Sequence, residues 1–329
     1  MPNTAILQKA AALLQAGELV AFPTETVYGL GADAANPLAV QKIFAAKGRP
    51  SDHPLIVHLS DMESLAHWAT EIPPVAYQLA EAFWPGPLTL ILKKQAWVPT
   101  AVTGGQDTVG LRTPAHPLAL QLIRAFAELP GSRGGVAAPS ANRFGRISPT
   151  TAAHVQEELG GRIAQILDGG ACQVGIESTI LDLSRLHTHG AEILRPGGLD
   201  PMRLAEVLGE MPKLREVKAQ DNAPRVSGSL LSHYAPTTPL QLVDSATLAG
   251  FLPPQPGARY GVLAYSPLAV HATSVITMPA EPVAYAHKLY AALRELDAQN
   301  LDLIIAEAPP ATLLWNAVCD RLRRAAAAK

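Results

Sequence analysis

Residues 19–30 read LVAFPTETVYGL, a short apolar run followed by a polar turn. Residues 19–22 are all apolar, which predicts a buried strand. Pro23 ends this strand because proline cannot donate a hydrogen bond to a neighbouring strand, and residues 24–29 predict a turn. Before the run, apolar residues recur at helical spacing over 6–14, and Gly17 suits the end of that helix. A helix that leads into a buried strand and a turn is typical of an α/β fold.

Downstream of this stretch, helical and strand patterns are mixed. Helices are predicted at 37–46, 74–83, 117–129 and 201–208, and strands at 55–59, 88–92, 109–112, 135–138, 178–183 and 193–194. Because these elements do not alternate in a strict β–α–β rhythm, we expect a mixed sheet.

The pattern changes near residue 210. Residues 211–236 are polar and irregular. After residue 239, strands at 259–265 and 301–306 alternate with helices at 283–296 and 313–323, which predicts a small parallel α/β domain. The length of 329 residues also suggests about two domains. We therefore expect a domain at 1–209, a linker at 210–238 and a second domain at 239–329.

Composition limits the classes of protein that fit. With 26 Lys and Arg against 28 Asp and Glu, the formal net charge is −2, which argues against broad binding of polyanions. Hydrophobic residues make up 48% of the chain, enough for a sizeable core and too many for a disordered protein.

Lys9 and Glu18 interrupt the opening segment, unlike in a signal peptide. No apolar run reaches the roughly 18 residues that span a membrane. Cys172 and Cys319 are too few for a disulfide framework or a four-cysteine zinc site. We therefore expect a cytoplasmic protein.

Two motifs carry groups that suit an anionic ligand. In Lys47-Gly48-Arg49-Pro50, two cations flank a glycine that permits close backbone approach, and arginine offers a planar fork for phosphate or carboxylate. In Pro139-Ser140-Ala141-Asn142, a hydroxyl and an amide follow an apolar run, at a strand end of the kind where open α/β sheets bind ligands. Taken alone, the first motif also fits a solvated basic turn, and the second fits an ordinary Ser/Asn turn.

Further candidates lie near predicted strands. Arg112 ends an apolar strand and needs an anion, which could equally be a structural carboxylate. Ser178 and Thr179 place two hydroxyls at the start of a strand, and Arg195 ends another. The segment Ser232-His233-Tyr234-Ala235-Pro236 puts a histidine and an aromatic residue in the linker, and such segments can act as lids. Cys172 has no evident local activating group, so a catalytic thiol is not expected.

Taken in this order, the motifs resemble those of the threonylcarbamoyl-AMP synthases, which carry a YrdC-like domain. They are TETVYGL (24–30), KGRP (47–50), PL (54–55), WPGPLT (84–89), GLR (110–112), PSAN (139–142), GIEST (175–179) and LRPG (194–197). The match covers about residues 1–200, and the pair Lys-x-Arg with Ser-x-Asn, so placed, is specific to this family. The linker segment 233–236 and the extra domain look like the longer, two-domain form. That form usually has Pro-Gly where this chain has Ser227-Gly228, and we expect this departure to touch no site residue.

The resemblance implies a YrdC-like twisted mixed sheet with helices around a basic cavity, followed by a small Rossmann-like α/β domain. It also implies the activity, in which L-threonine, bicarbonate and ATP give threonylcarbamoyl-AMP and pyrophosphate. A downstream threonylcarbamoyl transferase complex would then act on tRNA. Such a synthase is a nucleotidyltransferase, with ATP as a substrate and Mg²⁺ bound mainly to its phosphates. The reaction brings anions together. Cations and hydrogen-bond donors that orient these anions should therefore supply most of the catalysis.

The resemblance further implies roles for individual residues. Catalytic roles fall to Lys47, Arg49, Ser140 and Asn142. Threonine would lie among Thr26, His58, Arg112, Ala138 and Ser178, with its carboxylate clamped by both terminal nitrogens of Arg112. ATP would contact Lys47, Arg49, His53, Thr108, Ser140, Asn142, Ser148, Arg195 and Tyr234. Tyr234 would close over the nucleotide, and no metal site built from protein residues is expected.

Three alternatives stay open at this level. The chain could be an RNA-binding module of YrdC type without catalysis, although it has no basic stripe interleaved with aromatic residues, and we expect no strong direct binding of nucleic acid. Hydrogenase-maturation carbamoyltransferases contain a related domain, but in far longer chains with Cys-x2-Cys zinc fingers. Finally, the C-terminal domain could serve only as a docking platform.

Overall fold

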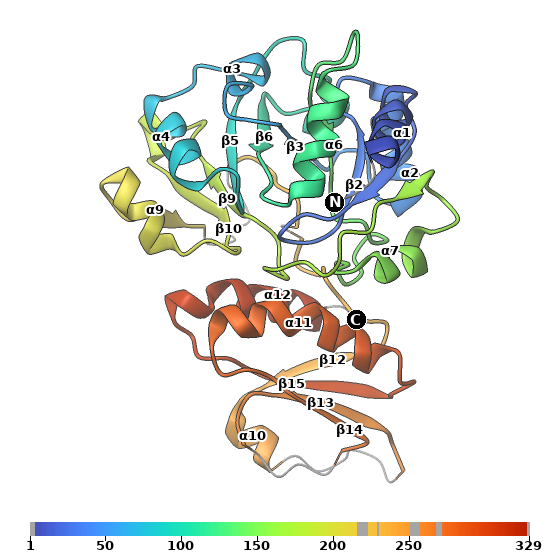
Figure 1. The fold of residues 1–329 in the computed structure, drawn as a ribbon. Coiled ribbons are helices and arrows are strands. Elements are labelled where there is room, and N and C mark those ends of the chain that lie inside the picture. Colours follow the sequence, from blue (N-terminus) through green and yellow to red (C-terminus); the bar gives the residue numbers. More distant parts are fainter. Residues whose placement is uncertain (1–3, 216–222, 229, 251–256, 268–271, 328–329) are drawn as a thin grey trace. The chain divides into compact units, whose positions relative to one another are not determined.

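The computed structural model describes residues 4–215, 223–228, 230–250, 257–267 and 272–327, and the chain divides into two compact units (Figure 1). The first unit comprises Met1–Arg143, Pro149–Gln173 and Glu177–Ser229. The second comprises Leu230–Lys329 together with two short segments from the middle of the sequence, Phe144–Ser148 and Val174–Ile176. The first of these segments begins two residues after the PSAN motif (139–142), and the second overlaps the GIEST motif (175–179).

One large sheet forms the framework of the first unit (Figure 1). Its strands are β1 (Val20–Phe22), β2 (Gly29–Asp33), β3 (Ile56–His58), β4 (Ala69–Thr70), β5 (Leu88–Lys94), β6 (Thr108–Arg112), β7 (Val136–Ala137), β8 (Gln165–Ile166), β9 (Thr179–Asp182), β10 (Glu192–Arg195) and β11 (Lys213–Leu214). Their order is β11-β10-β9-β5-β6-β3-β7-β2-β1-β8, with β4 paired to β5. Strands β5 and β9 are parallel whereas β5 and β6 are antiparallel, so the predicted mixed sheet is confirmed.

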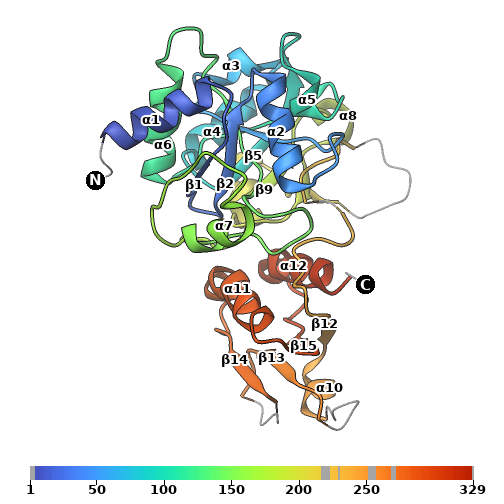
Figure 2. The same ribbon diagram turned by 90° about the vertical axis from the view of Figure 1, so that its right-hand side faces the viewer.

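Helices cover this sheet and close its core. They are α1 (Thr4–Gln15), α2 (Pro37–Lys47), α3 (Leu65–Trp68), α4 (Pro74–Phe83), α5 (Thr100–Thr103), α6 (Pro117–Ala127), α7 (Ala152–Leu159), α8 (Leu186–His189) and α9 (Pro201–Leu208). Helices α1 and α6 lie side by side because Leu14 of α1 and Phe126 of α6 share one apolar cluster (Figure 2). Among the described residues, every helix is too short or too polar to cross a bilayer.

The stretch 19–30 folds as a hairpin, with β1 antiparallel to β2. The side chain of Thr24 fixes the turn, because its Oγ1 accepts from the backbone N–H groups of Thr26 and Val27 and donates to the carbonyl of Val27. Strand β2 was not predicted, since its sequence GLGAD has no β-branched residue. Gly31 is required there, because a Cβ would lie 2.7 Å from a ring carbon of Phe22.

The second unit is a small parallel α/β domain, as predicted. Its elements are β12 (Leu240–Val243), α10 (Ser245–Ala249), β13 (Tyr260–Ala264), β14 (Ser274–Thr277), α11 (Pro282–Asp297), β15 (Leu303–Glu307), the 3₁₀ turn η1 (Leu313–Trp315) and α12 (Asn316–Ala326). All strand pairs in the order β12-β15-β13-β14 are parallel. Helices α11 and α12 lie on one face of the sheet and α10 on the other (Figure 1).

Candidate active site

Lys47 and the Ser-x-Asn motif meet at the end of α2. Gly48 caps this helix with a left-handed backbone (φ 63°), a conformation that glycine adopts without steric cost. The amine Nζ of Lys47 donates to the carbonyl oxygens of Ser140 (2.6 Å) and Asn142 (2.5 Å). Burial, together with the nearby charge of Arg49, holds the pKa of Lys47 well below its usual range. Two motifs that are far apart in the sequence thus form one buried cluster.

Arg49 and Arg195 both bind Ser227. Arg49 Nη1 donates to Ser227 Oγ (3.3 Å), and Arg195 Nη1 donates to the carbonyl oxygen of Ser227 (2.9 Å). A second nitrogen of Arg49 donates to the carbonyl of Pro54 (3.0 Å). We expected the departure at Ser227-Gly228 to touch no site residue, and this expectation is wrong. Ser227, which replaces the usual proline, accepts hydrogen bonds from two arginines that are predicted to contact ATP.

Residues 223–228 of the predicted linker lie on the sheet of the first unit. Ala223 and Val226 share an apolar cluster with Ile91 of β5 and Ile180 of β9. A small hollow at this place is lined by Thr108 of β6, Arg225 and Ser227, among others. The segment is also pinned by its backbone, since the N–H of Arg225 donates to the side chain of Gln106 (2.6 Å). This part of the linker therefore occupies the face of the sheet where predicted ATP residues converge.

Arg112, the last residue of β6, is held from three directions. Its Nε donates to the carbonyl of Gly86 (3.1 Å), Nη1 to Thr26 Oγ1 (3.0 Å) and Nη2 to Glu25 Oε1 (2.5 Å). The side chains of Arg112 and Glu25 are only 4% and 6% exposed. The sequence left open whether Arg112 binds the carboxylate of a substrate or one from the protein itself. In the structure, Arg112 binds the carboxylate of Glu25.

The other residues predicted to contact threonine come from neighbouring strands. His58 is the register partner of Arg112 between the parallel strands β3 and β6. Burial and the charge of Arg112 lower the pKa of His58 to about 3, so the imidazole is neutral at physiological pH. The backbone N–H of Ala138 donates to Ile56 of β3 (3.0 Å). Ser178 Oγ accepts from Arg195 Nη2 (3.1 Å), which links the predicted threonine and ATP residues.

The remaining predicted ATP residues divide between the two units. His53 is half-buried in the first unit, where burial and the charge of Arg49 lower its pKa. Ser148 and Tyr234 belong to the second unit. The Tyr234 ring there stacks on Tyr290 (centroids 5.8 Å apart), and the guanidinium of Arg321 lies 5.0 Å above it.

Two residues at this site were missed in the sequence. Glu25 lies inside the motif that suggested the family, yet no role was given to it, and the signal was a carboxylate placed next to a buried strand. Thr89 Oγ1 lies 2.8 Å from Ser178 Oγ. It occupies a β5 position that reads as an ordinary strand residue.

The described part of the chain can be compared with the predictions for metal ligands and thiols. It contains no group of three His, Cys, Asp or Glu side chains that could hold a metal ion. Cys172 and Cys319 are both free, and burial raises the pKa of the Cys172 thiol to about 12. A thiol with this pKa is a poor nucleophile at neutral pH, in keeping with the sequence prediction.

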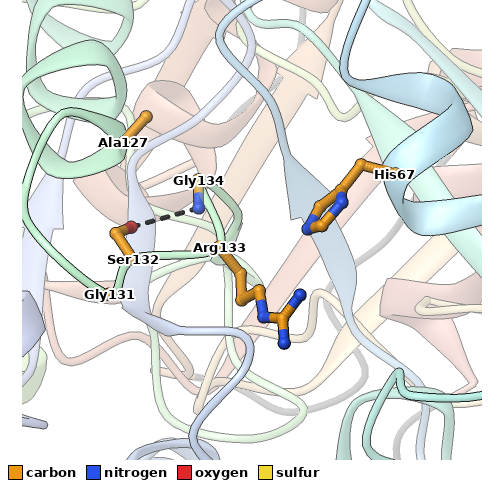
Figure 3. Close-up of a pocket in the computed structure, with 6 residues that line it drawn as sticks. All are labelled: His67, Ala127, Gly131, Ser132, Arg133 and Gly134. Carbon is orange, nitrogen blue, oxygen red and sulfur yellow. Dashed lines mark hydrogen bonds between the residues drawn. The ribbon is translucent and has the colours of Figure 1, made fainter.

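A separate open hollow of about 490 Å³ lies in the first unit (Figure 3). It is lined by His67 of α3 and by residues at and after the end of α6, including Ser132 and Arg133. None of the residues predicted from the sequence lines it, so it does not form part of the candidate site.

Two family models match the chain. Residues 12–197 match the Sua5/YciO/YrdC model, described as telomere recombination, and residues 200–327 match a model described as the C-terminal domain of threonylcarbamoyl-AMP synthase. The threonylcarbamoyl-AMP synthase of Pyrococcus abyssi is 42% identical over 328 residues, covering 96% of this chain and 92% of the relative. That of Bacillus subtilis is 43% identical over 334 residues, covering 98% and 94%.

The same two-domain architecture occurs in a solved structure. The crystal structure of Pyrococcus abyssi Sua5 in complex with L-threonine matches with a TM-score of 0.88 at 40% identity, over 98% of this chain and 95% of that one.

Proposed function

The chain belongs to the threonylcarbamoyl-AMP synthase family, and on this basis we propose that it makes threonylcarbamoyl-AMP and pyrophosphate from L-threonine, bicarbonate and ATP. It would act as a nucleotidyltransferase that serves tRNA modification. The observation that carries the proposal is the gathering of the buried cations Lys47, Arg49 and Arg195 with the Ser-x-Asn motif. The alternative of an RNA-binding module without catalysis is not favoured, because near full-length relatives are named as synthases.

Threonine would bind at the end of the site that holds Arg112. Three of the five guanidinium N–H groups are used by Gly86, Thr26 and Glu25, which leaves one N–H on each terminal nitrogen. These two groups could receive both oxygens of the threonine carboxylate. Neutral His58, Ala138 and Ser178 would enclose the rest of the molecule.

ATP would bind at the end that holds Lys47, Arg49 and Arg195, with further contacts from His53, Thr108, Ser140 and Asn142. The amine of threonine first forms a carbamate, either with CO₂ and release of a proton or with bicarbonate and release of water. A carbamate oxygen then attacks the α-phosphorus in line, the bond to the bridging oxygen breaks, and pyrophosphate leaves. The three cations would neutralise and align the phosphates while this charge moves.

Mg²⁺ would accompany the ATP phosphates rather than occupy a site of the protein. The described residues offer no carboxylate cage for it, so the contribution of the chain lies in its cations and hydrogen-bond donors.

The linker at 210–238 would act as a lid between a catalytic domain at 1–209 and a second domain at 239–329. Support comes from residues 223–228, which touch Arg49 and Arg195 through Ser227. Ser148 and Tyr234 remain predicted contacts of ATP. The product is a labile adenylate, which a downstream threonylcarbamoyl transferase complex would pass to tRNA in the cytoplasm.

The direct test is pyrophosphate release from ATP, with threonine and bicarbonate each omitted in turn and the adenylate identified by mass spectrometry. We expect release only when both are present. Arg49→Ala should lower kcat/KM for ATP by about 100-fold or more, since a charge-assisted contact to phosphate is lost, while the thermal unfolding midpoint changes little. Release that does not depend on threonine would refute the proposed reaction. A steep, salt-dependent affinity for bare tRNA without turnover would restore the RNA-binding alternative.

A further inference from the structure

Glu25 is a buried carboxylate fixed from both of its oxygens. Oε1 accepts from Arg112 Nη2 (2.5 Å), and Oε2 accepts from the backbone N–H of Ala115 (3.0 Å). Ala115 lies just after β6, the strand that ends in Arg112, so one short segment supplies both donors. The carboxylate therefore has one defined orientation beside the arginine.

This ion pair retains hydrogen-bonding capacity on both partners. Within the described residues, Arg112 keeps one unused N–H on each terminal nitrogen, as counted above. Glu25 accepts one hydrogen bond on each oxygen, whereas a carboxylate has about four acceptor positions. The pair can thus donate to an anionic group and accept from a cationic group at the same time.

Thr26 adds an acceptor between the two charges. The hydroxyl proton of Thr24 is used by the carbonyl of Val27, so in the contact between the hydroxyls of Thr24 and Thr26 (2.8 Å) the proton comes from Thr26. Thr26 Oγ1 also accepts from Arg112. Its remaining lone pair can only accept from a ligand, which suits an ammonium or a hydroxyl group and not a carboxylate.

The charges lead to the same conclusion. Arg112 and Glu25 together are neutral, and both are nearly inaccessible to water. A ligand that carries only a carboxylate would bring an uncompensated negative charge next to Glu25, where screening is weak. A zwitterion brings no net charge and matches the pair group by group.

We propose that Glu25 is a specificity-determining residue, which makes the Arg112 site select the zwitterionic amino acid over carboxylates that lack the amine. This inference rests on the proposed function, in particular on Arg112 as the carboxylate clamp. It concerns the binding of threonine, before its amine becomes a carbamate.

The test compares two ligands by isothermal titration calorimetry on the full-length protein. They are L-threonine and (R)-3-hydroxybutyrate, which keeps the carboxylate and hydroxyl of threonine but lacks the amine. We expect the wild type to prefer threonine by at least about tenfold, and Glu25→Gln to reduce this preference at least about fivefold, since a buried charge contact is worth this much or more. Glutamine keeps the shape and can still accept from Ala115, while its amide nitrogen takes the place of the oxygen that accepts from Arg112, so the charge and this contact are removed together.

Asp182→Asn is the matched control, because Asp182 is another buried carboxylate on the same sheet, paired with Arg185 (2.8 Å). It should lower stability and leave the ratio of the two affinities unchanged, as would any purely structural effect. Glu25→Asp retains the charge and should keep the preference, which provides a second variant if Glu25→Gln does not fold.

The outcomes separate the inference from the proposed function. Equal affinities of the wild type for both ligands, an unchanged ratio in Glu25→Gln, or a lost preference in folded Glu25→Asp would each overturn the role of Glu25. A wild type that binds neither ligand and releases no pyrophosphate would overturn the proposed function itself.

Discussion

At the scale of single residues, three buried cations at the predicted ATP end of the candidate site donate to backbone and hydroxyl oxygens. Lys47 lies between two carbonyl oxygens, and the side chains of Arg49 and Arg195 reach the hydroxyl and carbonyl of one serine. Three buried cations that lie close together suit a ligand that brings several negative charges, as a triphosphate does.

The lowered pKa of Lys47 predicts that ATP binding takes up a proton. Burial and Arg49 disfavour the ammonium form in the free protein, whereas the phosphates of bound ATP favour it. From about pH 8 upward, where the phosphates are already ionised, calorimetry in buffers of different ionisation enthalpy should show a net proton uptake that increases with pH until Lys47 deprotonates in the complex as well. Lys47→Arg keeps a charge that does not titrate and should abolish the uptake. Equal uptake in both proteins would exclude Lys47 as its source.

The sequence was informative about which residue types matter and less so about their partners. Lys-x-Arg and Ser-x-Asn carried chemistry that could be read directly, and the structure brings Lys47 to Ser140 and Asn142. The role of Ser227 could not be predicted from the sequence. It depends on a contact with Arg49, which lies far away in the sequence. Glu25 was overlooked for a similar reason, because its partner Arg112 comes from a different strand.

At the scale of elements, the end of α2 sets the geometry of the cation pair. Gly48 separates Lys47 from Arg49 and adopts a left-handed φ of 63° as the helix cap. A Cβ at this position would meet no atom within 4 Å. Glycine is therefore needed here for its backbone conformation and not for space.

Gly48→Ala should lower the free energy of unfolding by about 1 kcal/mol, because alanine disfavours the left-handed region. It should also raise KM for ATP several-fold, since any relaxation of φ moves Lys47 relative to Arg49. Gly209→Ala is the matched control, as Gly209 caps α9 with φ 76° and also has no atom within 4 Å of a Cβ. Chemical denaturation should show similar losses for both variants, and steady-state kinetics should show a defect only for Gly48→Ala. A similar rise of KM in both variants would show that the backbone conformation of Gly48 has no specific effect on the binding of ATP.

Elements with a strong apolar pattern were predicted, and weakly patterned ones were missed. Helix α6 and strand β5 carry long buried stretches, and both lie where the sequence places them. Strand β14 was missed because only Ile276 of its four residues is buried. Helix α7 was missed because it buries only Val155 and Leu159. Elements with so few buried residues are determined by tertiary contacts more than by local preference.

At the scale of the whole molecule, the net charge of −2 is an average over very different regions. Lys47, Arg49, Arg112 and Arg195 are all less than 7% exposed, so they contribute little to the surface that a polyanion would meet. The near-neutral net charge argues against broad binding of tRNA. It remains compatible with an anionic small-molecule substrate. Binding of nucleotide and later delivery to tRNA would then be tasks of different proteins.

The linker is divided between the two units, with residues up to Ser229 in the first and those from Leu230 in the second. In the second unit, Tyr234 has a φ of 61°, which is uncommon for tyrosine and has to be maintained by its surroundings. Its ring is 1% exposed between Tyr290 and Arg321, and the N–H of the following Ala235 donates to the carbonyl of Gly145 (2.9 Å). Strained backbone that is held by packing is typical of segments with a functional constraint.

If the linker shields the labile carbamate, Tyr234→Ala should uncouple the reaction. The ratio of ATP consumed to threonylcarbamoyl-AMP formed should rise by about twofold or more, because water reaches the intermediate when the lid loses its anchor. Tyr234→Phe separates two explanations, since it keeps the ring that packs on Tyr290 and removes only the hydroxyl. Wild-type coupling in the Phe variant would assign the effect to packing of the ring, whereas uncoupling in both would assign it to the hydroxyl. An unchanged ratio in Tyr234→Ala would mean that the linker does not protect the carbamate, and the lid proposal would then be abandoned.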